Sequence, residues 1–275
     1  MGRVLAANLV SAGHDVLATD LAGPDHCPEG ATFVPGVSAV AREAEAVVLS
    51  LPDRDASEQV AADIGATTGR VTTHVVDTST VGVAAARAID VLLAEVGVAY
   101  VDAPVSGGVA GARARTLVVM YAAPEVVCEV VEPVLAGLSD RRRWVGVQAG
   151  MAQALKLANN FLSATALAAT SEAVAFGLAA GLDLATMVEV LDTSSGRSAA
   201  TNDKFPNHVL TGRYASGFAN SLMAKDVRLY RSEADEQGIA TVIGSVTEDV
   251  WERFAAAEPG ADFTRIFPFV AEADG

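Results

Sequence analysis

Lys156 and Asn160 are the two side chains of this sequence whose types and spacing most directly suggest chemistry. They lie four residues apart in a stretch, 150–178, that is rich in Ala and Leu and holds no proline, so we expect one long helix. Residues four apart on a helix share one face. A lysine beside an amide could exchange a proton with a substrate there, whereas the alternative is a lysine that snorkels from the core to solvent.

The segment Ser106-Gly107-Gly108 could hold an anionic group. Two consecutive glycines let the backbone approach a ligand closely and point N–H groups at it, and the serine hydroxyl adds another donor. This combination suggests a cradle for the carboxylate of a small substrate. The alternative is an ordinary Gly-Gly turn.

The composition limits the classes of partner. The chain has 275 residues, enough for two domains, and its formal net charge of −15 disfavours nucleic acid and an anionic membrane surface. The apolar run 164–182 contains several polar residues and is therefore interpreted as a buried or interface helix. Cys27 and Cys128 form neither a metal spacing nor a disulfide framework, and no signal peptide is visible. We expect a cytoplasmic protein without a metal.

The pattern of the chain changes near residue 149. Before it, short apolar strands alternate with helices, which indicates a mostly parallel sheet with helices on both faces and ligands at the carboxyl ends of the strands. After it, the pattern is helical only, with a short terminal element at 262–275. The expected strands are 16–19, 32–34, 46–50, 71–76, 99–101, 117–122 and 143–147, and the further helices are 1–12, 37–45, 56–64, 83–96, 124–135, 184–191, 218–237 and 241–257.

The beginning of the chain matches the middle of a dinucleotide-binding unit: a helix, a stop at Gly13, a strand and the acidic Asp20. Met1 and Gly2 occupy the last two positions of the usual G-x-G-x-x-G loop, whereas its strand and first two glycines are missing. We therefore expect a sequence that is incomplete at its N-terminus or has a misassigned start.

Asp20 stands close to the spacing at which an acid meets the adenosine ribose hydroxyls of a dinucleotide. A carboxylate at this place would repel a 2′-phosphate, and no arginine follows it, which favours NAD over NADP. The alternative is an aspartate that simply begins a turn with Gly23.

These segments together resemble the β-hydroxyacid dehydrogenase family, the 3-hydroxyisobutyrate dehydrogenase-like enzymes. The resemblance implies a Rossmann-type dinucleotide-binding domain at 1–148, a long interdomain helix and an all-α C-terminal domain at 149–275. It also implies reversible NAD(P)-dependent oxidation of a short β-hydroxyacid at its alcohol carbon. The matching segments follow the family's order over nearly the whole chain and are Met1-Gly2, Leu51-Pro52, Asp77-Thr78-Ser79-Thr80, Asp102 through Gly108, Lys156 through Asn160, and Lys225-Asp226.

The resemblance assigns a role to each matching position. Lys156 corresponds to the catalytic lysine and Asn160 to its supporting amide, and both are expected to touch the substrate. The substrate carboxylate is expected at Ser106, Gly107 and Gly108. The expected cofactor contacts are Met1, Gly2, Asp20, Leu51, Pro52, Thr80 and Lys225.

Three places depart from the family pattern. Ala152 replaces a glycine, Arg115 replaces the glycine of a Gly-Thr-Leu segment, and Ala122-Ala123 replace a glycine pair. We expect these changes to add bulk or charge near the domain junction and to bear on substrate identity more than on reaction class. Arg115 is interpreted as a solvated surface side chain, with a second anion site as the alternative.

Several rival functions remain open at this point. A 6-phosphogluconate dehydrogenase characteristically has a histidine beside the helix asparagine, where this chain has Asn159, and imine reductases usually lack the lysine. A non-catalytic dinucleotide-binding or scaffold protein of the same fold would bind NAD without oxidising any hydroxyacid. A long apolar helix among other helices also favours a homo-oligomer, either a dimer or a tetramer.

Overall fold

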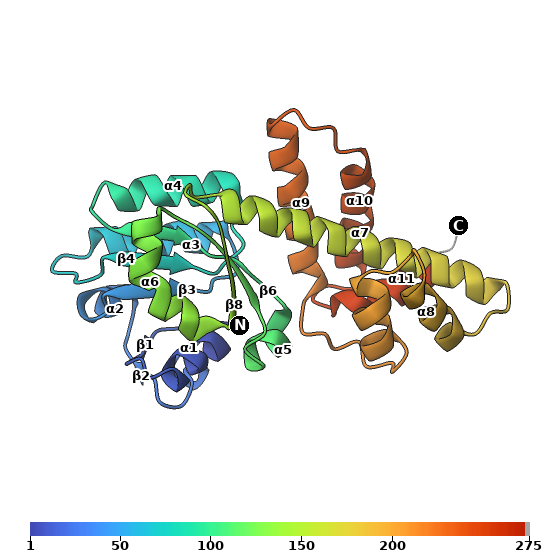
Figure 1. The fold of residues 1–275 in the computed structure, drawn as a ribbon, viewed down its shortest axis with the longest axis horizontal. Helices are drawn as coiled ribbons and strands as arrows, with labels where there is room; N and C mark the ends of the chain where they lie inside the picture. Colours follow the sequence, from blue (N-terminus) through green and yellow to red (C-terminus); the bar gives the residue numbers. More distant parts are fainter. Residues whose placement is uncertain (273–275) are drawn as a thin grey trace. The chain divides into compact units, whose positions relative to one another are not determined.

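The computed structural model describes residues 1–272 and divides the chain into two compact units, Met1–Lys156 and Leu157–Gly275. The helix α7 (Met151–Ala179) begins in the first unit and continues into the second (Figure 1). Its 29 residues bear out the single long helix expected from the Ala- and Leu-rich stretch.

The first unit is an α/β domain with two sheets. One is a parallel pair, β1 and β2, and the other has the order β3-β4-β5-β7-β6, with β8 beside β7. The strands are β1 (Leu17–Ala18), β2 (Thr32–Phe33), β3 (Ala46–Leu49), β4 (His74–Asp77), β5 (Ala99–Asp102), β6 (Val105–Ser106), β7 (Val118–Ala122) and β8 (Arg141–Gly146). The helices are α1 (Gly2–Ser11), α2 (Val37–Glu43), α3 (Arg54–Ala66), α4 (Val83–Ala94), α5 (Gly108–Arg113) and α6 (Glu125–Leu138), with a 3₁₀ turn η1 at Pro24–His26.

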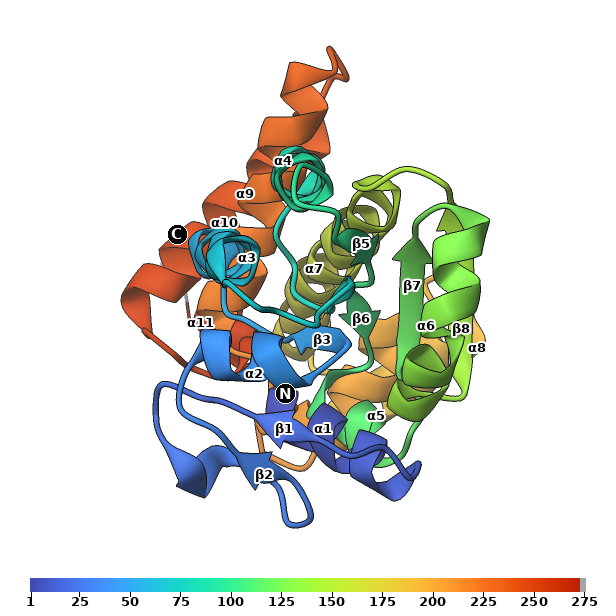
Figure 2. The same ribbon diagram turned by 90° about the vertical axis from the view of Figure 1, so that its left-hand side faces the viewer.

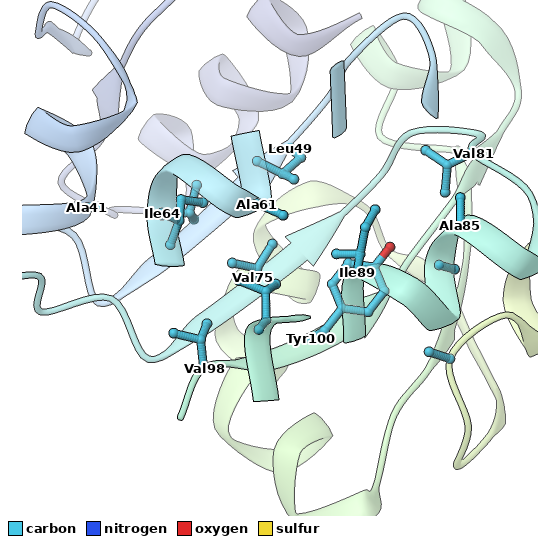
Figure 3. Close-up of a cluster of buried hydrophobic side chains, with 14 of the residues drawn as sticks. Ala41, Leu49, Ala61, Ile64, Val75, Val81, Ala85, Ile89, Val98 and Tyr100 are labelled. Atoms are coloured by element: carbon cyan, nitrogen blue, oxygen red, sulfur yellow. The ribbon is translucent and has the colours of Figure 1, made fainter. Parts of the chain in front are cut away.

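Successive residues of β4 and β5 point to opposite faces of the larger sheet, and both faces are buried at these two strands, whereas β8 has no buried residue. Val75 and Tyr100 enter one apolar cluster with α2, α3 and α4, which Figure 3 shows around Ile89. Val76 and Val101 enter a second cluster with α1, α5 and α6. The result is a helix–sheet–helix sandwich that leaves the strand ends as the places where side chains can meet a ligand (Figure 2).

The larger sheet is mostly parallel, as expected, because β3, β4 and β5 run parallel and β8 runs parallel to β7. The departure from this pattern is at β7, since it is antiparallel to β5 and to β6. The elements β6 and α5 were not expected. β6 has two residues, too few to show a period, and α5 begins with glycine, a poor helix former.

The second unit is all helical, as expected. Its core is centred on Phe205, Trp251 and Phe254, all fully buried. The helices after α7 are α8 (Leu184–Thr193), a π-helix η2 (Ala200–Val209), α9 (Asn220–Glu236), α10 (Val242–Ala257), a 3₁₀ turn η3 (Phe263–Arg265) and α11 (Ile266–Ala271). The π-helix was missed because it contains Asn202, Asp203 and Pro206, which do not favour a regular helix. Part of the expected terminal element, 273–275, lies outside the described residues.

Within residues 1–272, α7 is one helix that is long and apolar enough to cross a membrane by length and composition alone. The core helix of a globular domain meets the same criterion. Here α7 supplies Ala164, Leu167 and Val174 to the core of the second unit, and its first turn is tied to the sheet of the first. These contacts make it a core helix in this fold.

Candidate active site

Lys156 and Asn160 are both buried on α7, with exposed fractions of 8% and 5%. Helical geometry places them on one face, one turn apart. Gln153 precedes Lys156 by three residues and is fully buried on the same face. The first turns of α7 therefore present an amide, an amine and a second amide in one row along an otherwise Ala- and Leu-rich helix.

Asp226 on α9 fixes the orientation of the Asn160 side chain. Its Oδ2 accepts a hydrogen bond of 2.6 Å from Asn160 Nδ2, and its Oδ1 lies 3.2 Å from the Lys225 ammonium. Asn159 Nδ2 donates to Asn160 Oδ1 at 3.2 Å. Since the amide nitrogen of Asn160 is held by a carboxylate, its oxygen is the end that can receive a proton donor. Asp226 thus contacts two residues, Asn160 and Lys225, for which the family resemblance implies contacts with the substrate and with the cofactor.

The Ser106-Gly107-Gly108 segment forms the junction between β6 and α5. Ser106 ends β6 opposite Val118, and the next two residues have φ of +128° and +64°, which only glycine adopts without strain. A Cβ on Gly107 would lie 3.2 Å from Leu117 Cδ2. The segment is therefore a tight corner that requires glycine. Gly107 is exposed, Ser106 and Gly108 are half-buried, and the carboxylate cradle stays a prediction.

The loops after β3 and β4 are joined to each other. Ser79 Oγ accepts a hydrogen bond of 2.9 Å from Leu51 N, and Thr78 donates its N–H and its hydroxyl to Leu49 O. Thr80 follows directly and is half-buried, whereas Pro52 is exposed. Because the N–H of Leu51 is already bound, a cofactor contact at this residue would involve its side chain or its carbonyl.

Met1 and Gly2 lie at the start of α1, beside the loop after β3, whereas Asp20 follows β1 of the two-stranded sheet. A Cβ on Gly2 would lie 3.3 Å from Ser50 Cβ, so α1 begins directly beside the end of β3. The first turn of α1 holds neither a side-chain cap nor an acidic residue, which suits an anionic group. Asp20 is exposed after β1, and its Oδ1 accepts from Ala22 N at 2.8 Å. Part of its carboxylate thus orders the turn that the alternative interpretation expected.

Asp102 and Gln153, which the sequence did not single out as site residues, join the sheet to α7. Asp102 Oδ2 accepts from the backbone N–H groups of Gly150, Ala152 and Gln153 at 2.9, 3.1 and 3.1 Å. Its Oδ1 accepts from Gln153 Nε2 at 2.8 Å. Two features of the sequence could have indicated this connection. An aspartate ends each of two apolar strands, at 77 and at 102, and a glutamine stands at the start of the long helix, at 153.

Burial controls the ionisation of both strand-end aspartates. Desolvation raises the pKa of Asp102 to about 6, countered by hydrogen bonds from Gln153 and Gly150. Asp77, its register partner on β4, is also fully buried, and desolvation raises the pKa of its carboxyl too. Asp77 accepts from Ser79 N at 2.9 Å and from the Tyr100 hydroxyl at 3.3 Å. Two carboxylates therefore lie behind the strand ends, and one of them is bound to α7.

The three departures from the family pattern have structural roles inside the first unit. Arg115 has φ of +56° and donates to the carbonyls of Ala136 and Gly137 at 2.9 Å each, with Asp140 Oδ1 at 3.2 Å. Arg115 therefore caps the C-terminal end of α6 while its side chain stays 32% exposed, which agrees with the expected surface position. The alternative of a second anion site stays a prediction. Ala152 and Ala122 are fully buried in a cluster with Met120, so they fill the core.

No group of three or more His, Cys, Asp or Glu side chains in residues 1–272 is arranged to hold a metal ion. The polar groups at the strand ends and on α7 are instead amides, hydroxyls, carboxylates and one lysine. Such a set can bind a small polar substrate, hold it by hydrogen bonds and transfer a proton.

Two family models together match almost the whole chain. Residues 1–146 match the family model described as "NAD binding domain of 6-phosphogluconate dehydrogenase". Residues 150–270 match the family model described as "NAD-binding of NADP-dependent 3-hydroxyisobutyrate dehydrogenase". The fold, the strand-end loops and these matches define an oxidoreductase that uses a nicotinamide dinucleotide.

Individual relatives narrow the class. The chain is 33% identical to 2-(hydroxymethyl)glutarate dehydrogenase from Eubacterium barkeri, covering 92% of this chain and 85% of the relative. It is 31% identical to a probable 3-hydroxyisobutyrate dehydrogenase from Mycobacterium bovis, covering 97% and 93%. The solved 3-hydroxyisobutyrate dehydrogenase from Mycobacterium tuberculosis, in a structure with L-serine, superposes with a TM-score of 0.89 at 28% identity, covering 98% and 95%. The chain belongs to the β-hydroxyacid dehydrogenase family.

Proposed function

We propose that this enzyme oxidises the primary alcohol of a short β-hydroxyacid resembling 3-hydroxyisobutyrate, with Lys156 as the general acid and base. The observation that carries the proposal is the buried lysine on α7, one turn from an asparagine whose amide nitrogen is held by Asp226 at 2.6 Å. A lysine in its deprotonated form can accept the hydroxyl proton, and the ammonium that results can return it.

The roles follow from the residue types. Bound NAD(P)⁺ supplies the acceptor of the hydride that leaves the alcohol carbon. Lys156 Nζ takes the hydroxyl proton in oxidation and returns it to the carbonyl oxygen in reduction. Asn160 does not titrate in the relevant range, so it can orient the lysine through its amide oxygen without competing for the proton. The Ser106-Gly107-Gly108 corner would hold the substrate carboxylate and so place the alcohol carbon.

We propose NAD as the preferred cofactor. The exposed carboxylate at Asp20 follows β1, where the adenosine ribose of a dinucleotide is expected, and it is followed by Leu21-Ala22-Gly23 instead of a cation. The start of α1 beside Ser50 would hold the phosphates of the cofactor, and the joined loops after β3 and β4 would lie on its nicotinamide side. Asp20→Ser should raise kcat/KM for NADP relative to NAD by about tenfold or more, which is about 1.4 kcal/mol of discrimination. An unchanged ratio would contradict the assignment.

We also propose that the enzyme works as a homo-oligomer. Leu162 and Phe176 on α7 are 65% and 78% exposed, and Ala166, Ala169 and Ala173 lie between them at alternating spacings of four and three residues. Such a spacing forms one apolar stripe that a second copy can cover. Light scattering should show a dimer or a tetramer, and Leu162→Glu with Phe176→Glu should shift the mass toward a monomer. A wild-type monomer would refute this part.

The decisive experiment for the function is a rate measurement. The purified chain with NAD⁺ should form NADH from 3-hydroxyisobutyrate or from 2-(hydroxymethyl)glutarate, the substrates in the names of its relatives. Lys156→Ala should abolish this turnover while tryptophan fluorescence still reports NADH binding. NAD binding without turnover of any hydroxyacid in the wild type would favour a non-catalytic protein.

A further inference from the structure

We propose that Asp102 and Gln153 are positioning residues for Lys156, because they fix the first turn of α7 to the ends of β4 and β5. This inference rests on the proposed function for its kinetic consequence, since it concerns the placement of the general base. All three residues lie within the first unit, so the proposal depends on contacts inside one compact body.

The Asp102 carboxylate holds the beginning of α7 along its axis. The first N–H groups of a helix have no partner within the helix, and a negative charge is favoured beside them. Asp102 satisfies three of them at once, those of Gly150, Ala152 and Gln153, and is itself fully buried at the end of β5. A helix shifted by one residue would move about 1.5 Å and lose these bonds.

The Gln153 side chain fixes the rotation of the same helix. Its Oε1 accepts from Val81 N at 3.0 Å and from Gly82 N at 3.2 Å, and its Nε2 donates to Ser79 O at 3.1 Å and to Asp102. Every hydrogen-bonding position of this amide is therefore used. Since each residue turns the helix by about 100°, a fixed Gln153 determines the direction in which Lys156, three residues later, projects.

The chain entering α7 has little freedom to relax. Gly150 has φ of +90°, and a Cβ there would lie 2.8 Å from Val83 Cγ1 and 3.1 Å from Val83 O. The entry to α7 therefore rests directly on the start of α4. Only glycine at position 150 allows this close approach of the backbone to α4, and in this position the N–H of Gly150 also donates to Asp102.

Several charged or titratable groups surround Asp102. Asp77 lies opposite on β4 and Tyr100 precedes it on β5, whereas Arg87 and Asp90 lie on α4 near the same end. Desolvation raises the pKa of Asp102 to about 6, so the carboxylate is mostly ionised at pH 7.5 and above. Experiments at pH 7.5 and above therefore test the ionised carboxylate, which is the form that accepts hydrogen bonds from the three backbone N–H groups.

Asp102→Asn tests the proposal with a side chain of the same shape. If its oxygen faces the three backbone N–H groups, its NH₂ faces the NH₂ of Gln153, and two donors oppose each other. We expect kcat at pH 8 to fall roughly 10- to 100-fold with the KM for NAD changed less than threefold, since a displaced base costs rate. A merely structural role would leave kcat per folded molecule unchanged.

Asp77→Asn is the matched control. Asp77 is equally buried, pairs with Asp102 in the strand register and bonds to Ser79 and Tyr100 instead of α7. An asparagine keeps both bonds, because its oxygen can accept from Ser79 N and its NH₂ can donate to the Tyr100 hydroxyl. We expect kcat within threefold of the wild type. An equal loss in both variants would overturn the specific role of Asp102.

A second readout does not depend on turnover. The chain contains three lysines, at 156, 204 and 225, so trace labelling with acetic anhydride followed by peptide mass spectrometry can compare them directly. Asp102→Asn should raise the labelling of Lys156 relative to the other two by threefold or more, and Asp77→Asn should not. An unchanged ratio in Asp102→Asn, with unchanged kcat, overturns the proposal.

Two further variants cover the remaining outcomes. If Asp102→Asn does not fold, Gln153→Ala keeps the carboxylate cap and removes only the rotational anchor, and the same two readouts decide. The double variant Asp102→Asn/Gln153→Glu restores all the donor–acceptor pairs except the one to Ser79 O, and it should recover part of the lost kcat. If the wild type oxidises no hydroxyacid, the proposed function fails, and the labelling ratio still decides whether Asp102 positions Lys156.

Discussion

Two buried aspartates, one in each unit, hold opposite ends of the polar row on α7, and they do so differently. Asp102 binds the backbone N–H groups of the first turn, whereas Asp226 binds a single side chain, that of Asn160. Asp102 is surrounded by amides and lies in register with another carboxyl, whereas Asp226 has the Lys225 ammonium at 3.2 Å. One carboxylate fixes a helix, and the other fixes the direction of one amide.

The difference indicates which property each aspartate controls. Loss of Asp102 leaves several buried donors without an acceptor, so it should affect stability and the placement of the whole row. Loss of Asp226 removes the acceptor that orients one amide, so it should affect rate more than folding. Lys156 lies between the two and is the residue that both arrangements serve in the proposed function.

Removal of Lys156 should have the largest effect. Lys156→Ala should lower kcat for hydroxyacid oxidation by about 10²- to 10⁴-fold, the usual contribution of general acid–base catalysis. The measurement is NADH absorbance under saturating NAD⁺ and substrate. Lys156→Arg is the control for charge, because an arginine stays protonated and cannot accept the proton. Retention of a tenth of the activity in either variant would contradict a general base at this position.

Alanine at the two aspartates should separate them by stability. Asp102→Ala leaves three backbone N–H groups and one amide N–H without an acceptor. Each buried unsatisfied donor costs about 1–3 kcal/mol, so we expect the free energy of unfolding to fall by about 4 kcal/mol. Asp226→Ala leaves one amide donor without its acceptor and removes the carboxylate beside the partly exposed Lys225 ammonium, and it should cost about 1–2 kcal/mol. Urea unfolding followed by circular dichroism measures both at the same pH. Equal losses would show that the two aspartates play the same role.

Asp226→Asn should change rate with little change in fold. If the oxygen of the new side chain stays with the Lys225 ammonium, its NH₂ faces Asn160 Nδ2, so the Asn160 amide must turn and present a donor instead of an acceptor along the row. We expect kcat to fall roughly tenfold with the KM for NAD unchanged, because the lysine loses its orienting acceptor.

The double variant Asn160→Asp/Asp226→Asn is the control for this effect. It returns an oxygen to position 160, since the amide introduced at position 226 can donate to the new carboxylate, and kcat at high pH should partly recover. The carboxylate would also favour the protonated lysine, so the rise of the oxidation rate with pH should shift to higher pH. No recovery at any pH would indicate that Asp226 acts through Lys225 instead.

The sequence predicted the lysine–asparagine row, the glycine corner and the alternation of strands and helices, because each has a local signature in residue type and spacing. It did not predict the Asp102–Gln153 connection, whose partners lie 51 residues apart and meet only once β5 and α7 are packed. Arg115 shows the same limit, since its partners on α6 are more than twenty residues away. Long-range polar pairs depend on tertiary packing, which periodicity does not encode.

The smallest expected effect is a pH-dependent difference between wild type and Asp102→Asn. Burial raises the pKa of Asp102 to about 6, above its ordinary value, so the folded protein keeps this proton at a pH where the unfolded chain has lost it. The folded state then binds more protons than the unfolded state between about pH 4 and pH 6, and the free energy of unfolding falls as pH rises through this range. Relative to Asp102→Asn, the wild type should lose about 1 kcal/mol of unfolding free energy between pH 5 and pH 6 and little more above pH 7.

Asp77 remains in both proteins, so its own raised pKa cancels in the difference. Urea unfolding of the pair at pH 5, 6 and 7.5 measures this slope. A difference that grows in favour of the wild type as pH rises would mean that the four hydrogen bonds outweigh burial, and that Asp102, like a carboxylate beside a cation, has a lowered pKa.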